Sequence, residues 1–432
     1  MAKSLVEGTS GAASAVKVGR VRWVIVALLF AATAINYVDR QMIGLLKPTL
    51  QDEFGWHETT YADIVFYFQL AYAIGYIVFG NIVDRVGARF GYAAAFVIWT
   101  GAHMLHGAVR SVFGFAVVRF LLGIGESGNF PAGLKAVTEW FPKKERALAT
   151  GIFNAGANVG AIITPLIVPA LTLAYGWRAA FVITGAVSLV WLVAWLAVYR
   201  RPSESKRLSD AERAYIESDP ADPVAKVPWL RLLRCKETWV FAIGKFLTDP
   251  IWWMFLFWTP DFLVKRHGLD LKTFGPPLVV IYVISDLGSI GGGWLSSRLI
   301  HRGWSINAAR KMTMLICAVA VTPIFFAQYV DNLWAAVAII SLATAAHQAW
   351  SANLYTLPSD TFPRKAVGSV IGIGGTAGAI GGMIFSLYIG QVLERLGSYG
   401  LIFAVAGSVY LIALLIIQLL SPRLDEAKLA IA

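Results

Sequence analysis

The sequence predicts an all-α membrane protein with twelve transmembrane helices in two six-helix halves. Three observations lead to this fold class: long apolar stretches without charged residues, a polar segment in the middle of the chain, and a pattern that recurs in both halves. Together they argue against a soluble globular domain and against a β-barrel, whose strands alternate apolar and polar residues over about ten positions.

The apolar stretches are long enough to cross a lipid bilayer. The 432 residues are 57% hydrophobic and 15% charged, whereas soluble domains carry about 25% charged residues. Residues 179–199 and 396–422 contain no charge at all, and a transmembrane helix needs about 20 apolar residues. The predicted spans are 21–45, 60–82, 90–109, 112–137, 147–171, 178–199, 238–263, 275–297, 312–330, 333–357, 367–393 and 397–420.

The placement of the basic residues predicts the orientation. The net charge is +11, and most Lys and Arg lie in the termini and in the loops on the same side of the predicted spans, such as Arg85, Lys143 and Arg310. Because Lys and Arg are enriched in cytoplasmic loops, we expect both termini in the cytoplasm. The basic balance therefore reports topology, and it does not indicate a nucleic-acid partner.

The polar segment divides the chain into two halves. We expect a cytoplasmic tail at 1–20, a first half at 21–199, a linker at 200–237, a second half at 238–421 and a tail at 422–432. Within the linker, Ser209 and Glu212 have the spacing of a capping box that opens a short helix.

The two halves share a repeated pattern. Residues 139–144 (Glu-Trp-Phe-Pro-Lys-Lys) are matched by 360–365 (Asp-Thr-Phe-Pro-Arg-Lys), and the same shift superposes Gly151 on Gly372 and Gly160 on Gly381. Parallel repeats related by an axis along the membrane normal are a transporter architecture, with the substrate site between the halves.

Charged side chains inside spans are costly and mark functional positions. Asp39 and Arg40 interrupt the first span, and Arg119 and Glu126 lie seven residues apart in the fourth, on one face of a helix. One interpretation is an arginine that binds a carboxylate beside an acid that binds a proton. The alternative is an ion-pair network that only fastens the two spans.

Other features carry weaker signals. Glycines at four-residue spacing, Gly156 with Gly160 and Gly374 with Gly378 and Gly382, indicate close helix packing. His103 and His106 are typical of core or interfacial residues rather than of a proton relay. The sequence contains no phosphate-binding loop, zinc-protease motif or nucleophile motif, so we expect no enzyme activity and no metal site.

The turn between the second and third spans resembles the loop signature of the major facilitator superfamily. The spacing Gly-x-x-x-Asp-Arg-x-Gly-x-Arg is met by Gly80, Asp84, Arg85, Gly87 and Arg89, which the resemblance implies form a gating loop. Residues 36–41, 119–131, 139–142, 208–213 and 346–349 further resemble the anion:cation symporter family, and within it the bacterial hexuronate transporters.

The resemblance implies roles for individual residues. It makes Asp39 and Glu126 proton-coupling sites, and Arg40 and Arg119 carboxylate anchors. The remaining substrate contacts that it implies are Tyr37, Tyr72, Asn154, Asn158, Trp253, His347, Gln348, Ser351 and Asn353.

The expected function is proton-coupled symport of a sugar acid anion, a hexuronate such as glucuronate or galacturonate, into the cytoplasm by alternating access. The alternatives are transport of an aldonate, aldarate or other small organic anion, a channel, and a membrane sensor derived from a transporter. The resemblance implies a monomer in the bacterial inner membrane that needs protons as coupling ion and no cofactor.

Overall fold

The computed structural model describes residues 19–218, 229–425 and 427, and every regular element in these residues is a helix. Much of the predicted tails, 1–20 and 422–432, lies outside them, as does part of the predicted linker. The α-helices are α1 (Val21–Phe54), α2 (Glu58–Leu105), α3 (Val112–Glu126), α4 (Asn129–Trp140), α5 (Lys143–Val198), α6 (Asp210–Ile216), α7 (Trp229–Leu232), α8 (Lys236–His267), α9 (Gly275–His301), α10 (Ile306–Val321), α11 (Leu333–Leu354), α12 (Leu357–Thr361), α13 (Arg364–Leu396) and α14 (Gly400–Leu420). The 3-10 helices are η1 (His106–Ala108), η2 (Pro202–Glu204) and η3 (Thr322–Tyr329).

The described helices account for the twelve predicted crossings. Nine helical segments of the described chain are long and apolar enough to span a membrane. Two of these, α2 and α5, are interrupted by glycines with positive φ, Gly87 (81°) and Gly176 (82°), so each contains two arms. A Cβ on Gly91 would lie 2.8 Å from Val83, which shows that the arms of α2 fold back on each other. Helices α3 and α4 supply the remaining crossing.

The crossing made by α3 and α4 is interrupted at its centre. Ser127 and Gly128, which separate the two helices, keep right-handed helical dihedral angles. The amide of Ser127 still donates to the carbonyl of Gly123 (3.1 Å). The two helices therefore form one continuous crossing, and Glu126, the last residue of α3, lies near its middle.

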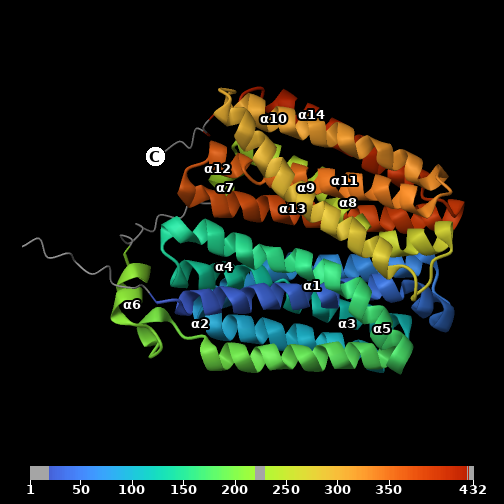
Figure 1. Ribbon diagram of the computed structural model, residues 1–432, viewed down its shortest axis with the longest axis horizontal. Helices are drawn as coiled ribbons and strands as arrows, with labels where there is room; N and C mark the ends of the chain where they lie inside the picture. Colours follow the sequence, from blue (N-terminus) through green and yellow to red (C-terminus); the bar gives the residue numbers. More distant parts are fainter. Residues whose placement is uncertain (1–18, 219–228, 426, 428–432) are drawn as a thin grey trace, which may run out of the picture.

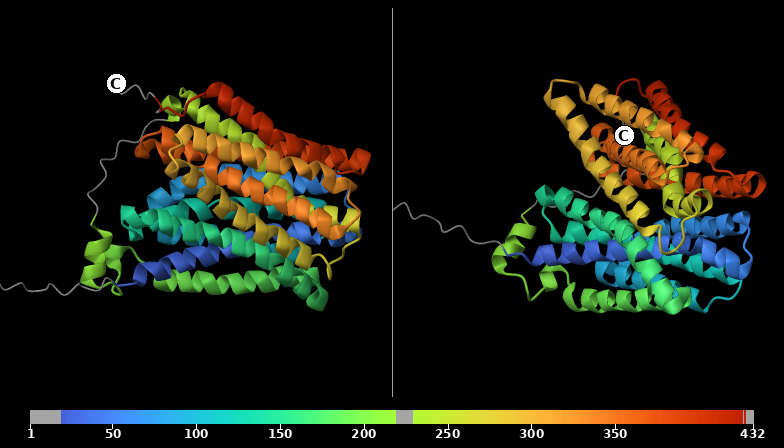
Figure 2. Two further views of the ribbon diagram at one scale, coloured as in Figure 1. Left: turned by 45° about the horizontal axis from the view of Figure 1, so that its top comes forward. Right: turned by 45° about the vertical axis from the view of Figure 1, so that its right-hand side comes forward.

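The crossings form two bundles. Figure 1 shows α1 to α5 together in one bundle and α8 to α14 in the other, and Figure 2 shows the same division from two further directions. We call them the N bundle and the C bundle. We call the end that carries α6 and α7 the linker end, and the opposite end, where Gly55 joins α1 to α2, the far end.

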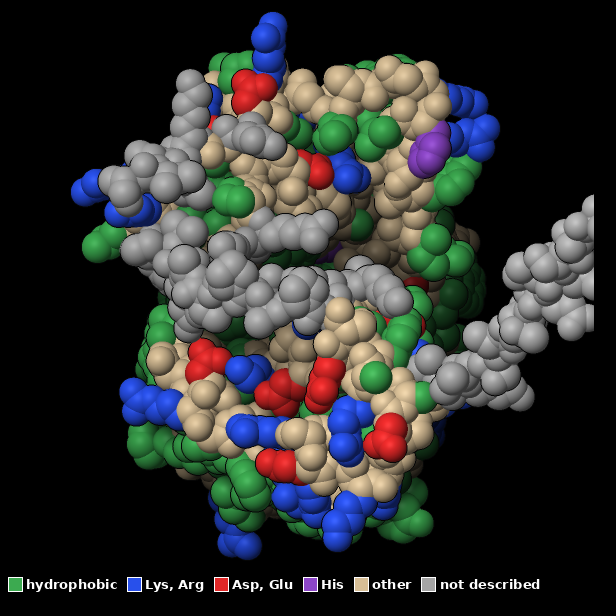
Figure 3. All heavy atoms as spheres, turned by 90° about the vertical axis from the view of Figure 1, so that its left-hand side faces the viewer, with side chains coloured by type: hydrophobic (Ala, Val, Ile, Leu, Met, Phe, Trp, Pro, Cys, Tyr) green, Lys and Arg blue, Asp and Glu red, His purple; other side chains and the backbone are tan. Residues whose placement is uncertain are grey.

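The linker end is rich in basic side chains, as the positive-inside pattern predicts. Figure 3 views the molecule from this end and shows Lys and Arg side chains around its rim. The orientation of this end in a membrane stays a prediction.

Helix α6 is fixed to the start of α1. The hydroxyl of Ser209 accepts from the amide of Glu212 (3.2 Å), which confirms half of the predicted capping box. The Glu212 carboxylate does not return to the amide of Ser209. It accepts from the amides of Val21 (3.2 Å) and Arg22 (3.1 Å) at the uncapped start of α1, because those free amides need an acceptor.

The glycines at four-residue spacing pack against neighbouring helices, as predicted. On Gly156 and Gly160 of α5, an added Cβ would overlap the carbonyl oxygens of Phe30 and Ala34 in α1. These positions let α1 and α5 approach closely, so any larger side chain would push them apart.

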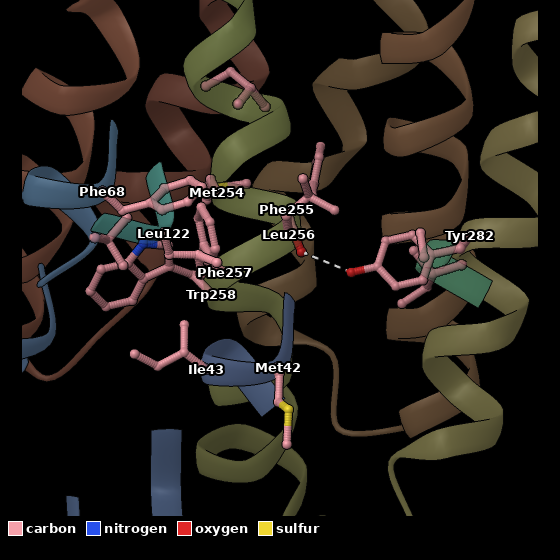
Figure 4. Close-up of a cluster of buried hydrophobic side chains, with 14 of the residues drawn as sticks. Met42, Ile43, Phe68, Leu122, Met254, Phe255, Leu256, Phe257, Trp258 and Tyr282 are labelled. Carbon is pink, nitrogen blue, oxygen red and sulfur yellow. Dashed lines mark hydrogen bonds between the residues drawn. The ribbon is translucent and has the colours of Figure 1, made fainter. Parts of the chain in front are cut away.

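Between the bundles, toward the far end, lies a buried core of mostly aromatic side chains. Figure 4 shows Phe68 of α2 and Leu122 of α3 beside Phe257 and Trp258 of α8. Each of these side chains is at most 1% exposed. This core joins the two bundles between the far end and the charged side chains near the centre of the molecule.

Candidate functional site

The centre of the site is an ion pair between Arg40 and Glu126. The Arg40 Nε atom lies 2.8 Å from the Glu126 Oε2 atom, and the side chains are 4% and 0% exposed. Arg40 Nη2 also donates to the amide oxygen of Asn36 (2.8 Å), which lies one helical turn earlier in α1. The other carboxylate oxygen of Glu126 has no hydrogen-bond partner in the described chain. The pair therefore joins α1 to the end of α3.

Four aromatic rings surround the Arg40 guanidinium. Its Cζ atom lies 4.8 Å from the ring centre of Tyr37, 4.9 Å from Tyr72, 5.3 Å from Trp253 and 5.7 Å from Phe68. Three of these rings belong to the N bundle, and Trp253 comes from α8 of the C bundle. Cation–π contacts hold the guanidinium between the bundles. The structure thus brings together the predicted Tyr37, Tyr72 and Trp253 around Arg40.

Arg119 lies next to Arg40 and is fully buried. Its Nη2 atom makes a 3.4 Å contact with the carbonyl oxygen of Arg40, and its Cζ atom is 4.5 Å from the Phe68 ring. The Nε and Nη1 atoms have no hydrogen-bond partner in the described chain. A buried guanidinium with unsatisfied N–H groups is a strong site for a carboxylate, because binding would restore those hydrogen bonds.

Asp39 makes no hydrogen bond or ion pair with either arginine in the described chain. Its Oδ2 atom accepts from the Trp99 indole (3.0 Å), and its Oδ1 atom lies 3.2 Å from His103 Nε2. His103 also lies 2.8 Å from the Thr184 hydroxyl. Consecutive residues of a helix point about 100° apart, so Asp39 and Arg40 face different neighbours. His103 is buried, as expected for a core residue, but the sequence did not reveal its contact with Asp39.

The predicted gating-loop residues lie in the turn at the linker end of α2. Gly87 is the positive-φ residue that divides this helix. Arg89 donates to the carbonyl oxygen of Leu196 in α5 (2.8 Å), and Asp84 lies 3.7 Å from Lys135 of α4. Arg85 is exposed, and a Cβ on Gly80 would meet open space. The described contacts tie the turn to the N bundle, and its gating role stays a prediction.

The predicted residues of the second half are more scattered. His347 lies 2.5 Å from the Tyr410 hydroxyl and stacks on Trp252. The Asn353 side-chain amide donates to the carbonyl oxygens of Gly292 (3.2 Å) and Ala349 (2.9 Å) inside the C bundle. Within the described chain no hydrogen bond or ion pair connects the other predicted residues to Arg40. These are Asn154, Asn158, Gln348 and Ser351.

A second charged cluster, absent from the sequence prediction, closes the far end. We call Lys47, Glu58, Asp261 and Lys265 the far-end cluster. Lys47 Nζ lies 2.7 Å from Glu58 and 2.7 Å from Asp261, and Lys265 Nζ lies 2.5 Å from Glu58 and 3.0 Å from Asp261. Each bundle therefore contributes one lysine and one carboxylate to the cluster. Each lysine pairs with the carboxylate of its own bundle and with that of the other bundle.

The far-end cluster was missed because its members fall near the ends of the predicted spans. Charges at such places are typical of the membrane surface. In the structure α1 continues to Phe54, which buries the Lys47 side chain completely. Among the described side chains, every ion pair between the bundles lies at the far end, so this end is closed.

A third charged group lies on α8. Lys245 Nζ lies 2.6 Å from Asp249 and 2.8 Å from the hydroxyl of Tyr355. The four-residue spacing of Lys245 and Asp249 within a predicted span could have revealed them. Both side chains belong to the C bundle, on the same helix as Trp253.

Comparisons with known proteins agree with the resemblance drawn from the sequence. The model of the Major Facilitator Superfamily matches residues 29–386. The chain is 34% identical over 411 residues to the hexuronate transporter of Escherichia coli K12, covering 93% of this chain and 94% of the relative. It is 34% identical over 309 residues to the galacturonate transporter of Dickeya chrysanthemi, covering 70% of this chain and 89% of the relative.

A solved structure shares the fold. A bacterial homologue of the human lysosomal transporter Spinster superposes with a TM-score of 0.73 at 18% sequence identity, covering 94% of this chain and 98% of that one.

Proposed function

Because the chain belongs to the major facilitator superfamily, and is therefore a multi-pass membrane transporter rather than an enzyme, we propose that it carries a sugar acid anion together with protons. The proposed substrate is a hexuronate such as glucuronate or galacturonate, which the names of two relatives support. The proposed membrane is the bacterial inner membrane, with both termini in the cytoplasm. Protons serve as the coupling ion, and the carrier acts as a monomer without a cofactor.

The observation that carries the proposal is the buried pair of Arg40 and Glu126. A substrate carboxylate that docks on Arg40 competes with the Glu126 carboxylate, which lies 2.8 Å from the same guanidinium. Protonation of Glu126 removes this competitor and frees Arg40 for the anion. Each ligand thereby makes the binding of the other more favourable, which is the thermodynamic condition for coupled transport.

The surroundings of Arg40 suit a sugar acid. A guanidinium offers a planar fork to a carboxylate, and the rings of Tyr37 and Tyr72, which each carry a hydroxyl group, lie beside it. The Trp253 ring provides an apolar wall from the C bundle. Arg119 lies behind Arg40 and supplies a second positive charge with unsatisfied N–H groups.

Asp39 is proposed as a separate proton-binding group. Its partners are Trp99 and His103 rather than the arginines, so a proton on Asp39 does not compete directly with substrate. We propose that it exchanges protons on the side of α1 that faces the second arm of α2.

The closed far end fits one state of an alternating-access cycle. The far-end cluster and the aromatic core of Phe68 and Phe257 join the bundles on one side of Arg40. We propose that this state opens the site toward the cytoplasm, and that separating the far-end cluster opens it toward the opposite side.

The test is uptake of labelled glucuronate and galacturonate into proteoliposomes that contain the purified protein. We expect saturable uptake that is stimulated by an inward proton gradient and abolished in Arg40→Gln. The matched control is Arg178→Gln, which removes a partly exposed arginine paired with Glu53 at 2.7 Å. Transport of an aldonate or aldarate in clear preference to both hexuronates would contradict the substrate assignment. Normal uptake by Arg40→Gln would show that the ion pair only fastens the helices.

A further inference from the structure

The group formed by Lys245, Asp249 and Tyr355, which we call the Lys245 cluster, is not used by the mechanism above. Lys245 and Asp249 lie one turn apart on α8, and Tyr355 follows the end of α11. The Lys245 side chain is 4% exposed and the Asp249 side chain 18% exposed. The Lys245 ammonium also lies 4.1 Å from the Tyr355 ring centre. Burying an ion pair in a span costs free energy, so we expect a pair at this position to have a function.

The Lys245 cluster lies on the helix that brings Trp253 to Arg40. Asp249 precedes Trp252 and Trp253 by three and four residues, so the three side chains share one face of α8. Trp253 contacts Arg40 across the boundary between the bundles, with the guanidinium carbon 5.3 Å from the ring centre. Lys245 lies two turns from Trp253, about 12 Å along the helix axis toward the linker end. From this placement we infer that the cluster lies beside the end of a bound substrate that is opposite the carboxylate held by Arg40.

The hydrogen-bonding capacity of the cluster suits hydroxyl groups. An ammonium has three N–H donors, and two of those of Lys245 are directed at Asp249 and Tyr355, which leaves one free. The partly exposed Asp249 carboxylate accepts additional hydrogen bonds. A sugar hydroxyl both donates and accepts, so it can bind both members of this pair at once.

The charge of the cluster disfavours a second carboxylate. The positive charge of Lys245 is neutralised by Asp249 at 2.6 Å. An incoming carboxylate would meet the like charge of Asp249 and could accept from only one free N–H group. Exclusion by an opposing charge is a common source of specificity.

We propose that the Lys245 cluster is a substrate subsite that binds the hydroxyl-bearing end of a sugar acid and rejects a second carboxylate there. This inference rests on the proposed function, and it narrows the proposed substrates to sugar acids with a single carboxylate. Hexuronates and aldonates are accepted, whereas aldarates of the same carbon skeleton are rejected.

The first experiment is competition for labelled galacturonate uptake in proteoliposomes by unlabelled galacturonate, galactonate and galactarate. We expect the concentration for half-inhibition to be at least tenfold higher for galactarate than for the two monoanions. Equal inhibition by galactarate would overturn the inference while leaving sugar acid transport intact. Failure of all three compounds to bind in a thermal-shift assay would instead overturn the proposed function.

The second experiment uses Asp249→Asn, with Asp270→Asn in the exposed loop before α9 as the matched control. Removing the negative charge leaves Lys245 free to attract a second carboxylate. We expect the preference for galacturonate over galactarate to fall at least tenfold in Asp249→Asn and to stay unchanged in the control. A change of equal size for both compounds would show that the pair only fastens α8 to Tyr355.

Tyr355→Phe provides an independent variant if Asp249→Asn does not fold. It frees one N–H group of Lys245 while leaving the ion pair in place. We expect a smaller fall in the same preference. An unchanged preference in Tyr355→Phe, together with equal inhibition by galactarate in the parent, would overturn the proposal.

Discussion

Replacing Lys47 by methionine should open the far end. Lys47 is the fully buried member of the far-end cluster and contacts one carboxylate from each bundle, Glu58 and Asp261, at 2.7 Å. Breaking a buried ion pair costs about 3–5 kcal/mol. In Lys47→Met the two carboxylates still pair with Lys265, which is 37% exposed. We therefore take the lower limit of this cost, about 3 kcal/mol. This free energy corresponds to a shift of roughly 100-fold in the ratio of open to closed far ends.

The assay is labelling of a cysteine at the far end by a membrane-impermeant maleimide. Ala62 of α2 is 1% exposed and lies against Gly390 of α13, so Ala62→Cys is shielded while the bundles touch. The native Cys235 and Cys317 are replaced by alanine. The labelling rate follows the population of the open state, so we expect it to rise about 100-fold in Lys47→Met.

The matched control is Arg266→Met. It removes a 2.5 Å ion pair with Asp331 at the same end, but this pair lies within the C bundle and Asp331 is 91% exposed. We expect no change in labelling, since exposed pairs contribute little. The reasoning is refuted if Lys47→Met labels at the parent rate, or if Arg266→Met accelerates labelling to the same extent.

Further predictions concern the site and the packing of the N bundle. Arg119→Lys should weaken galacturonate binding about tenfold to 100-fold in isothermal titration calorimetry, because an ammonium cannot replace the buried planar fork; unchanged affinity would remove Arg119 from the site. Asp39→Asn should retain galacturonate binding but lose proton-driven accumulation, because Asp39 faces Trp99 rather than Arg40; loss of binding would contradict this. Gly156→Ala should lower the stability by about 1–3 kcal/mol, measured by thermal unfolding in detergent. Gly151→Ala, with open space around it, should be neutral, and equal losses for both would argue against the close contact.

The fold could be predicted from the sequence because lipid imposes strong rules. Charge-free stretches of 20 residues have to form helices that satisfy their own backbone hydrogen bonds. The spacing of the glycines in the sequence also predicted the turn at Gly87 and the close helix packing at Gly156. The predicted spans ended at residues 45 and 263, whereas α1 and α8 continue to Phe54 and His267, so Lys47 and Lys265 fell outside the predicted spans.

The site could be predicted only in part. The spacing of Arg119 and Glu126 placed them on one face of a crossing, and an ion-pair network between the first and fourth spans was one of the two interpretations. The spacing did not assign Glu126 to Arg40 in particular. The sequence also placed Asp39 inside a span. Its contact with His103 depends on how α1 packs against α2, which helical spacing does not determine. Contacts between the bundles, such as that of Arg40 with Trp253, arise from tertiary packing that one sequence does not encode in any local pattern.

The central claim is that Glu126 couples protons to the anion held by Arg40. The most direct measurement compares accumulation of labelled galacturonate under an inward proton gradient by the parent, by Glu126→Gln and by Glu217→Gln, which changes an exposed carboxylate after α6. Glutamine cannot exchange a proton, so Glu126→Gln should exchange labelled for unlabelled galacturonate without accumulating it, while Glu217→Gln should match the parent. Accumulation by Glu126→Gln at the level of the parent would contradict the account.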